Sequence, residues 1–211
     1  MKDKILNLIK NNKRFVLLFM CLAIFIAILI NVLNGNVAEF DNSIYNLITS
    51  LRSNFATVFF RAITKFADAE TLILIAIICL VVIKNKKTGA SIVINLACSG
   101  FINHLIKEIV QRPRPPMEFR MVEEASFSFP SGHAMTSATF YGLIIYFVCK
   151  NVKNKKLRNT ISITLSLLIF LIGMSRIYLG VHYASDVLAG FAFAIVYLVL
   201  YITFVLKLFK I

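Results

Sequence analysis

The stretch Phe15–Ile30, FVLLFMCLAIFIAILI, is apolar throughout and decides the class of fold. A helix needs about 20 mostly apolar residues to cross the hydrocarbon core of a bilayer, and the apolar character extends from here to residue 33. Five cations precede the stretch within the first 14 residues. Because the following NVLNGNVAEF offers no convincing small-residue cleavage site, we expect an uncleaved first membrane helix rather than a signal peptide.

Long apolar stretches recur along the whole chain of 211 residues, which is 59% apolar, 16% charged and has a mean hydropathy of +0.81. A chain with these values is too hydrophobic for an ordinary soluble domain. We therefore predict an all-α integral membrane bundle in which residues 1–211 form a single domain. Its six transmembrane helices are expected at roughly 15–33, 69–84, 89–109, 131–149, 159–177 and 184–206.

The segment 41–66 differs from the predicted spans because cations interrupt its apolar residues. Leu, Ile and Phe recur at helical spacing, with Arg52, Arg61 and Lys65 between them. This pattern is typical of an amphipathic helix that lies on the membrane surface or packs over a bundle. We expect one such helix within this segment.

The distribution of Lys and Arg predicts how the bundle is oriented. Fifteen of the 23 lie in the N-terminal tail, the 84–88 and 150–158 loops and the C-terminal tail. With six spans these four regions share one face, which the positive-inside rule makes cytoplasmic, so both termini are expected inside. The net charge of +13 comes from short blocks of Lys and Arg between apolar runs. The chain has no basic helix and no basic segment with interleaved aromatic residues, which are typical of proteins that bind nucleic acid, so no nucleic-acid partner is expected.

Three polar clusters lie at the opposite, extracytoplasmic ends of the predicted spans. They read KEIVQRPRP (Lys107–Pro115), PSGH (Pro130–His133) and SRIYLGVHYASD (Ser175–Asp186). Ionisable residues next to apolar spans are costly unless they serve a function. Together the clusters supply cations, two histidines, a carboxylate and a serine, which is the chemistry needed to hold a phosphate and transfer its phosphoryl group.

His182 and Asp186 are spaced four residues apart, so on a helix they would share one face. The carboxylate could then accept a hydrogen bond from one imidazole nitrogen and leave the other free as a nucleophile. A purely structural His–Asp pair is the alternative. Arg176, shortly before this pair, favours the functional interpretation.

Lys107, Arg114 and Arg176 are candidate phosphate ligands, because guanidinium groups bind phosphate oxygens in pairs and lysine adds a point charge. Three cations would also stabilise the charge of a phosphoryl-transfer transition state. Alternatively, any one of them contacts lipid headgroups at the interface. Arg112 and Arg120 fit that second interpretation better than Arg114 does.

The PSGH cluster opens the fourth predicted span. Ser131 can cap the helix, Gly132 lets backbone approach a ligand, and free N–H groups at a helix N-terminus bind anions. His133 then lies where it could act as a general acid. His104, one turn before Lys107, is expected to be a packed, hydrogen-bonded histidine, and the alternative is that it lines the polar mouth of the site. A zinc site of His104, His133 and His182 lacks short-spaced ligand pairs, so we expect no metal.

The three clusters resemble the signatures of the type 2 phosphatidic acid phosphatase family, a superfamily shared with vanadium-dependent haloperoxidases. These signatures are a Lys followed after six residues by Arg-Pro, then Pro-Ser-Gly-His, then Ser-Arg, five residues, His, three residues and Asp. Every position is present here, in order and spacing, across residues 107–186. The six-span layout extends the likeness to most of the chain.

The resemblance implies a two-step hydrolysis without metal or other cofactor. His182, oriented by Asp186, would attack phosphorus and form a phosphohistidine, and His133 would protonate the leaving group and then assist attack by water. The resemblance further implies a phosphate cradle, formed by Lys107, Arg114, Ser131, Gly132 and Arg176.

The expected substrate is a membrane lipid phosphate or diphosphate. Undecaprenyl diphosphate is narrowly favoured over phosphatidylglycerophosphate and phosphatidate, although nothing in the sequence reads the lipid tail. A phosphotransferase that passes the group to another acceptor is the main alternative. A transporter would place its charges near mid-membrane, whereas these gather at one rim. The abundance of Lys, Asn and Ile suggests a bacterial cell membrane, and the oligomeric state is not predicted.

Overall fold

The computed structural model describes residues 12–211, and this part of the chain consists of helices and contains no β-strand. The predicted all-α class is confirmed. Lys2, Lys4 and Lys10, which contributed to the predicted orientation, lie outside the described residues. Five helical segments are long and apolar enough to cross a bilayer: α2 (Lys13–Leu33), α6 (Lys86–Val110), α7 (Gly132–Asn151), α8 (Lys155–Tyr178) and the segment Ala184–Leu208.

The segment Ala184–Leu208 comprises three helical elements in succession. The α-helix α9 covers Ala184–Leu200, the π-helical turn η3 covers Tyr201–Val205, and α10 covers Leu206–Leu208. Two tyrosines fasten this segment to α6, since the Tyr197 hydroxyl donates to the Asn95 carbonyl at 3.2 Å and the Tyr201 hydroxyl to the Ser91 carbonyl at 2.7 Å. These bonds satisfy polar groups in the interior of the bundle.

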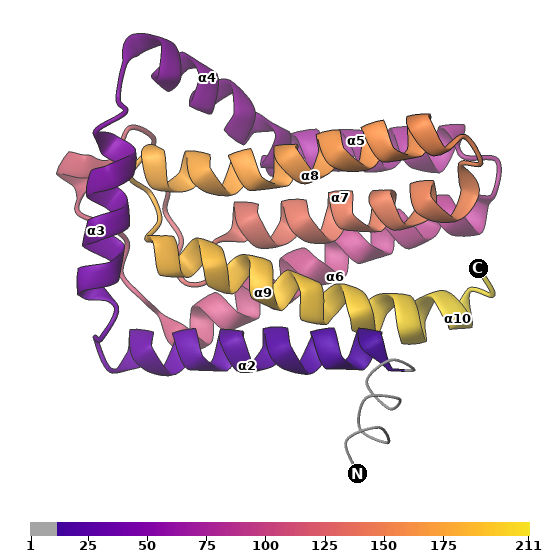
Figure 1. Ribbon diagram of the computed structural model, residues 1–211, viewed down its shortest axis with the longest axis horizontal. Helices are drawn as coiled ribbons and strands as arrows, with labels where there is room; N and C mark the ends of the chain where they lie inside the picture. Colours follow the sequence, from indigo (N-terminus) through magenta and orange to yellow (C-terminus); the bar gives the residue numbers. More distant parts are fainter. Residues whose placement is uncertain (1–11) are drawn as a thin grey trace.

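The predicted second span is the shorter helix α5, Ala69–Val82. Its 14 residues rise about 21 Å, less than the roughly 30 Å of a hydrocarbon core. The helix α4, Asn54–Thr64, and the 3₁₀ turn η1, Lys65–Ala67, precede it. Figure 1 shows α4 sloping from the α3 end of the molecule to the start of α5, so that the two helices follow one another along the bundle.

One amphipathic helix was expected within 41–66, and the structure has two helices over this segment. The helix α3, Ala38–Thr49, crosses the end of the bundle, and α4 starts after a break (Figure 1). Ser53 causes a new start, since its side chain accepts a hydrogen bond from the Ala56 N–H and caps α4. Arg52, in the break, donates to the Tyr178 carbonyl at 3.0 Å and thereby ties the corner to α8.

Polar caps define where the long helices begin. Asn85 caps α6, Ser131 caps α7 and Asn154 caps α8, each through a side-chain oxygen that accepts a backbone N–H. The predicted capping role of Ser131 is therefore confirmed. At the other end of α6, Gln111 adopts a left-handed conformation with φ 49° and turns the chain into the loop that carries Arg112 and Arg114.

The bundle has two different ends. The α5–α6 and α7–α8 connections lie at the end where the chain finishes, and α3 crosses the other end (Figure 1). The last turns of α6 and α8 and the first turns of α7 and α9 meet at the α3 end. The predicted convergence of the three polar clusters on one end of the bundle is thus observed.

Candidate active site

A cavity of about 220 Å³ lies at the α3 end of the bundle, where the three polar clusters meet. Residues from all three clusters and from the loop before α7 line it: Asn103, His104, Lys107, Arg114, Glu124, Ser126, Gly132, His133 and His182. Arg176, from the last turn of α8, reaches the same site through its contact with Glu124. Seven of the eight predicted site residues contribute to this region directly or through one contact, and Ser131 caps the helix that carries His133.

His182 is buried in the turn between α8 and α9 rather than on α9 itself. The expectation of a His–Asp pair on one helical face is therefore wrong. Gly180 makes the turn possible, since its φ is +70° and a Cβ would lie 2.0 Å from the Phe119 carbonyl oxygen. Phe119 is the last residue of the short helix η2, Met117–Phe119, in the loop between α6 and α7.

Asp186 nevertheless faces His182, because it is the third residue of α9 and reaches back over the helix start. Its Oδ2 lies 3.4 Å from His182 Nδ1 and accepts hydrogen bonds from the Tyr183 N–H at 3.0 Å and the Ser128 hydroxyl at 2.5 Å. Asp186 is fully buried. The carboxylate is thus held by several donors and orients Nδ1 of the imidazole.

The other nitrogen of His182 faces the phosphate-binding candidates. Nε2 lies 3.1 Å from Nη1 of Arg114, which can donate only, so Nε2 presents its lone pair. Burial lowers the pKa of His182 well below its usual range, and the charges of Arg114 and Lys107 lower it further. The ring is therefore neutral at physiological pH, and the lone pair of Nε2 accepts a hydrogen bond from Arg114.

The three predicted phosphate ligands are buried and held by the surrounding chain. Arg114 donates from Nη1 to the Val181 carbonyl at 2.8 Å and from Nε to the Ser126 carbonyl at 2.5 Å. Lys107 donates to the Phe127 carbonyl, and Arg176 donates from Nη1 to the Thr64 hydroxyl at 2.7 Å. Burial lowers the pKa of Arg114, yet an arginine remains charged. These hydrogen bonds hold the three cationic side chains in place within the site.

Glu124 lies between two of these cations, a role that the sequence analysis did not predict. Its carboxylate accepts from Arg176 and lies 3.4 Å from Nη2 of Arg114. Burial alone would raise the pKa of Glu124, but Arg176 and Arg114 outweigh it and lower the pKa. A carboxylate therefore lies between the guanidinium groups of two of the predicted phosphate ligands.

His133 lies in the first turn of α7, across the cavity from His182. Its Nε2 donates to Oδ1 of Asp68 at 3.0 Å, and this bond is the main reason why the pKa of Asp68 lies below its usual value. Gly132 beside it is needed for close packing, since a Cβ there would lie 3.1 Å from Oδ1 of Asn103. The sequence analysis did not foresee Asp68.

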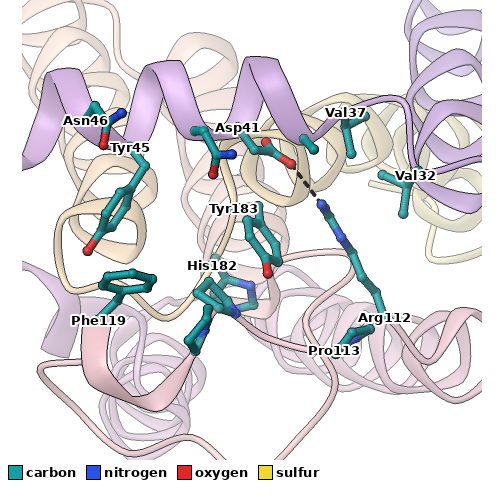
Figure 2. A pocket seen from close by; sticks show the side chains of 15 residues that line it. Val32, Val37, Asp41, Tyr45, Asn46, Arg112, Pro113, Phe119, His182 and Tyr183 are labelled. Carbon is teal, nitrogen blue, oxygen red and sulfur yellow. Dashed lines mark hydrogen bonds and ion pairs between the residues drawn. The ribbon is translucent and has the colours of Figure 1, made fainter.

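Arg112 corrects a second expectation, because it does not face lipid headgroups. Its Nη1 donates to Oδ1 of Asp186 at 2.6 Å, and its Nη2 donates to Oδ2 of Asp41 on α3 at 2.8 Å. Figure 2 shows Arg112 reaching Asp41 in a cavity of about 700 Å³ that His182 also lines. Burial lowers the pKa of Arg112, but Asp186 and Asp41 outweigh burial and raise it.

His104 corrects a third expectation, because it is exposed rather than packed. Its side chain is 65% exposed, and its Nδ1 lies 3.9 Å from the Glu108 carboxylate. His104, His133 and His182 all line the small cavity. Within residues 12–211, no group of three His, Cys, Asp or Glu has the arrangement of a metal site.

The comparison with known families now bears on this geometry. The profile of the PAP2 superfamily matches residues 88–210, which contain all three polar clusters. The chain belongs to the PAP2 superfamily. It is 34% identical over 179 residues to phosphatidylglycerophosphatase B of Bacillus subtilis, covering 81% of this chain and 86% of that protein. It is 27% identical over 181 residues to an undecaprenyl-diphosphatase of Sulfolobus acidocaldarius, covering 82% and 81% respectively.

A solved PAP2 structure has the same fold. A crystal structure of a transmembrane PAP2-type phosphatidylglycerolphosphate phosphatase from Bacillus subtilis superposes with a TM-score of 0.82. The likeness covers 90% of this chain and 96% of that structure at 27% identity. This PAP2 protein is thus a multi-span membrane phosphatase that hydrolyses lipid phosphates.

Proposed function

We propose that the PAP2 reaction of this protein proceeds through a phosphohistidine on His182. The observation that carries the proposal is the placement of Nε2 of His182, 3.1 Å from Arg114, on a neutral ring whose other nitrogen faces Asp186. Nε2 attacks phosphorus while Lys107, Arg114 and Arg176 balance the charge of the phosphoryl oxygens. Ser131 and Gly132 add the N-terminus of α7 to the cradle.

His133 completes the proposed reaction from the other side of the cavity. Its proton passes to the departing oxygen as the P–O bond breaks, and the neutral ring then removes a proton from the water that attacks the phosphohistidine.

The cradle supplies the positive charge that a divalent metal provides in other phosphatases. Full turnover in EDTA is the expected result, and activity that vanishes in chelator and returns with zinc or magnesium would contradict it.

A rapid-quench experiment tests the phosphohistidine directly. Purified protein is mixed with a ³²P-labelled lipid phosphate and denatured in alkali, where a phosphohistidine survives but a phosphoserine or acyl phosphate does not. The label should appear within one turnover, map to the peptide that contains His182 and be lost in acid. Label on the His133 peptide would contradict the assignment.

We propose phosphatidylglycerophosphate as the first substrate to test. The relative with 34% identity over most of both chains carries this activity in its name, and the crystal structure at TM-score 0.82 does too. Undecaprenyl diphosphate, which the sequence narrowly favoured, remains the second candidate because the Sulfolobus relative is matched over four-fifths of both chains. Phosphate release from both lipids in one detergent, by one preparation, ranks them by kcat/KM.

We propose that the site faces the extracytoplasmic side of a bacterial cell membrane. The basic α5–α6 and α7–α8 loops and the C-terminal tail lie at the end away from the site. In cells that carry a variant without native cysteines, Glu123→Cys should react with a membrane-impermeant maleimide, and Asn154→Cys should not. The reverse pattern would place both termini outside and the reaction at the inner leaflet.

A further inference from the structure

Asp68 stands at the N-cap position of α5 but does not cap it. An N-cap aspartate ordinarily accepts a backbone N–H from the second or third residue of its own helix. Asp68 has the extended backbone of such a cap, with φ −63° and ψ 144°, yet it makes no capping bond through its side chain. Its carboxylate instead bonds to Nε2 of His133 on α7, at 3.0 Å. The side chain of Asp68 thus bonds to α7 and leaves the N-terminus of α5 without a side-chain cap.

The turn that carries Asp68 is fastened to the two helices that form the site. The Tyr141 hydroxyl on α7 donates to the Phe66 carbonyl at 2.7 Å, and Ala67, which belongs to the turn, is buried. At the start of the same turn, the Thr64 hydroxyl accepts a hydrogen bond from Arg176 on α8 at 2.7 Å. The five residues 64–68 therefore touch both the proposed acid and one phosphate ligand from outside the cavity.

We infer that Asp68 is a positioning residue for His133, forming a second His–carboxylate pair that serves the leaving group as His182 and Asp186 serve the attack. The inference rests on the acid role proposed for His133. Because the bond to Asp68 engages Nε2, Nδ1 is the nitrogen left to reach the departing oxygen. The proton passes from Nδ1 to that oxygen, the ring becomes neutral, and Asp68 stays ionised throughout.

The charges that face His133 come from three other elements. Arg176 on α8 brings a positive charge to the ring, and Glu124 in the loop before α7 and Asp68 bring negative charges. Lys65, in the turn, acts on Asp68 rather than directly on the ring. When a phosphate takes the place of Glu124 between the arginines, Asp68 remains as the carboxylate bonded to the ring. It therefore determines whether His133 holds its proton until the bond breaks.

Asp68→Asn tests the inference, because it removes the charge and preserves the size of the side chain. We expect kcat/KM on a dialkyl-glycerol phosphate to fall by about 10- to 100-fold, with less than a twofold change on p-nitrophenyl phosphate, whose phenolate departs without a proton. The alkaline limb of the kcat/KM profile on the lipid should move to lower pH. Equal losses on both substrates, or an unmoved alkaline limb, would overturn the inference.

Two further variants separate a positioning role from a structural one. Asp68→Ser keeps a side chain that can cap α5 and must reproduce the substrate dependence of Asp68→Asn. Glu70→Gln removes an exposed carboxylate from the same first turn without a contact to His133 and should leave both activities unchanged. Inhibition by orthovanadate, a phosphate analogue, should be retained in every variant, which shows that the cradle is intact.

A double-mutant cycle distinguishes failure of this inference from failure of the proposed function. In a His133→Ala background, adding Asp68→Asn should cause no further loss, since the group that it positions is gone. If His133→Ala affects both substrates equally, the acid role itself is wrong. If His133→Ala depends on the leaving group but Asp68→Asn does not, the acid role holds and Asp68 has no part in it.

Discussion

The two histidines of the site sit in opposite surroundings. The side chain of His182 is 1% exposed and its partner Asp186 is fully buried, whereas the side chains of His133 and Asp68 are 19% and 46% exposed. Cations surround His182 from the cradle side, and Asp186 behind it is neutralised by Arg112. His133 lies at hydrogen-bond distance from Asp68, and both side chains are partly exposed to solvent.

This difference matches what each step of a phosphoryl transfer requires. A nucleophile must be neutral, and burial among cations removes the proton from His182. A general acid needs a partner that stabilises its protonated form, and Asp68 lies at hydrogen-bond distance from Nε2 of His133. One residue type can thus serve the two proposed roles because the fold surrounds it differently. The predictions below test this contrast, beginning with the largest effect.

His182→Ala should abolish turnover, because it removes the nitrogen that is proposed to attack phosphorus. We expect kcat on a lipid phosphate to fall by about 10,000-fold or more. His104→Ala is the matched control, since this exposed histidine lines the same cavity and should lose less than twofold. Substantial steady-state activity in a folded His182→Ala protein would remove the contrast between the two histidines.

Arg112→Lys should reduce kcat by about 10- to 100-fold while KM stays within twofold, because lysine cannot bridge two carboxylates as a guanidinium does. Arg112 holds Asp186 from one side and Asp41 from the other, so its loss disturbs the carboxylate that faces His182. The loss should be the same on p-nitrophenyl and lipid phosphates. A loss confined to the lipid substrate would link Arg112 to lipid binding instead.

Glu124→Gln should strengthen inhibition by orthovanadate about 3- to 10-fold, because the carboxylate between Arg114 and Arg176 competes with an incoming anion. The neighbouring Glu123→Gln is the control, since that side chain is exposed and should change inhibition less than twofold. Weaker inhibition in Glu124→Gln would mean that the carboxylate orients the arginines rather than occupying their ligand site.

The pH profile should show the smallest effect. A lowered pKa keeps His182 unprotonated at pH values where an ordinary histidine, with a pKa of about 6.5, has gained its proton. The acid limb of kcat/KM should therefore lie well below pH 6.5, after correction for the separately titrated ionisation of the substrate. An acid limb at or above pH 6.5 would place His182 in a solvated environment.

Sequence reasoning predicted the parts of this molecule that depend on local pattern. Apolar length located the membrane helices within a few residues, and the spacing of Lys107, Arg114, His133, Arg176 and His182 gave a set of residues that the fold brings to one end. Helix caps such as Ser131 were also readable, because capping depends on a few consecutive residues. The break between α3 and α4 was missed, although Ser53 followed by a new apolar period could have signalled it.

The second layer of the site was out of reach because its partners are far apart in the chain. Asp41 meets Arg112 across 71 positions, and Asp68 meets His133 across 65. Nothing near either aspartate distinguishes it from an ordinary helix-terminal carboxylate. Glu124 was likewise one of two adjacent glutamates in a loop, and only the fold shows which of them turns inward.

His182 follows α8 in the sequence, and this order has a consequence for the synthesis of the protein. Chains emerge from the ribosome starting at the N-terminus, so the turn 64–68, the cations of the cradle and His133 are all made before the His182 turn and α9. The carboxylate of Asp41 is synthesised before both of its partners, Arg112 and Ser185. The proposed nucleophile is therefore synthesised after the cations and the histidine that share its cavity, and the site is complete only once the His182 turn has been made.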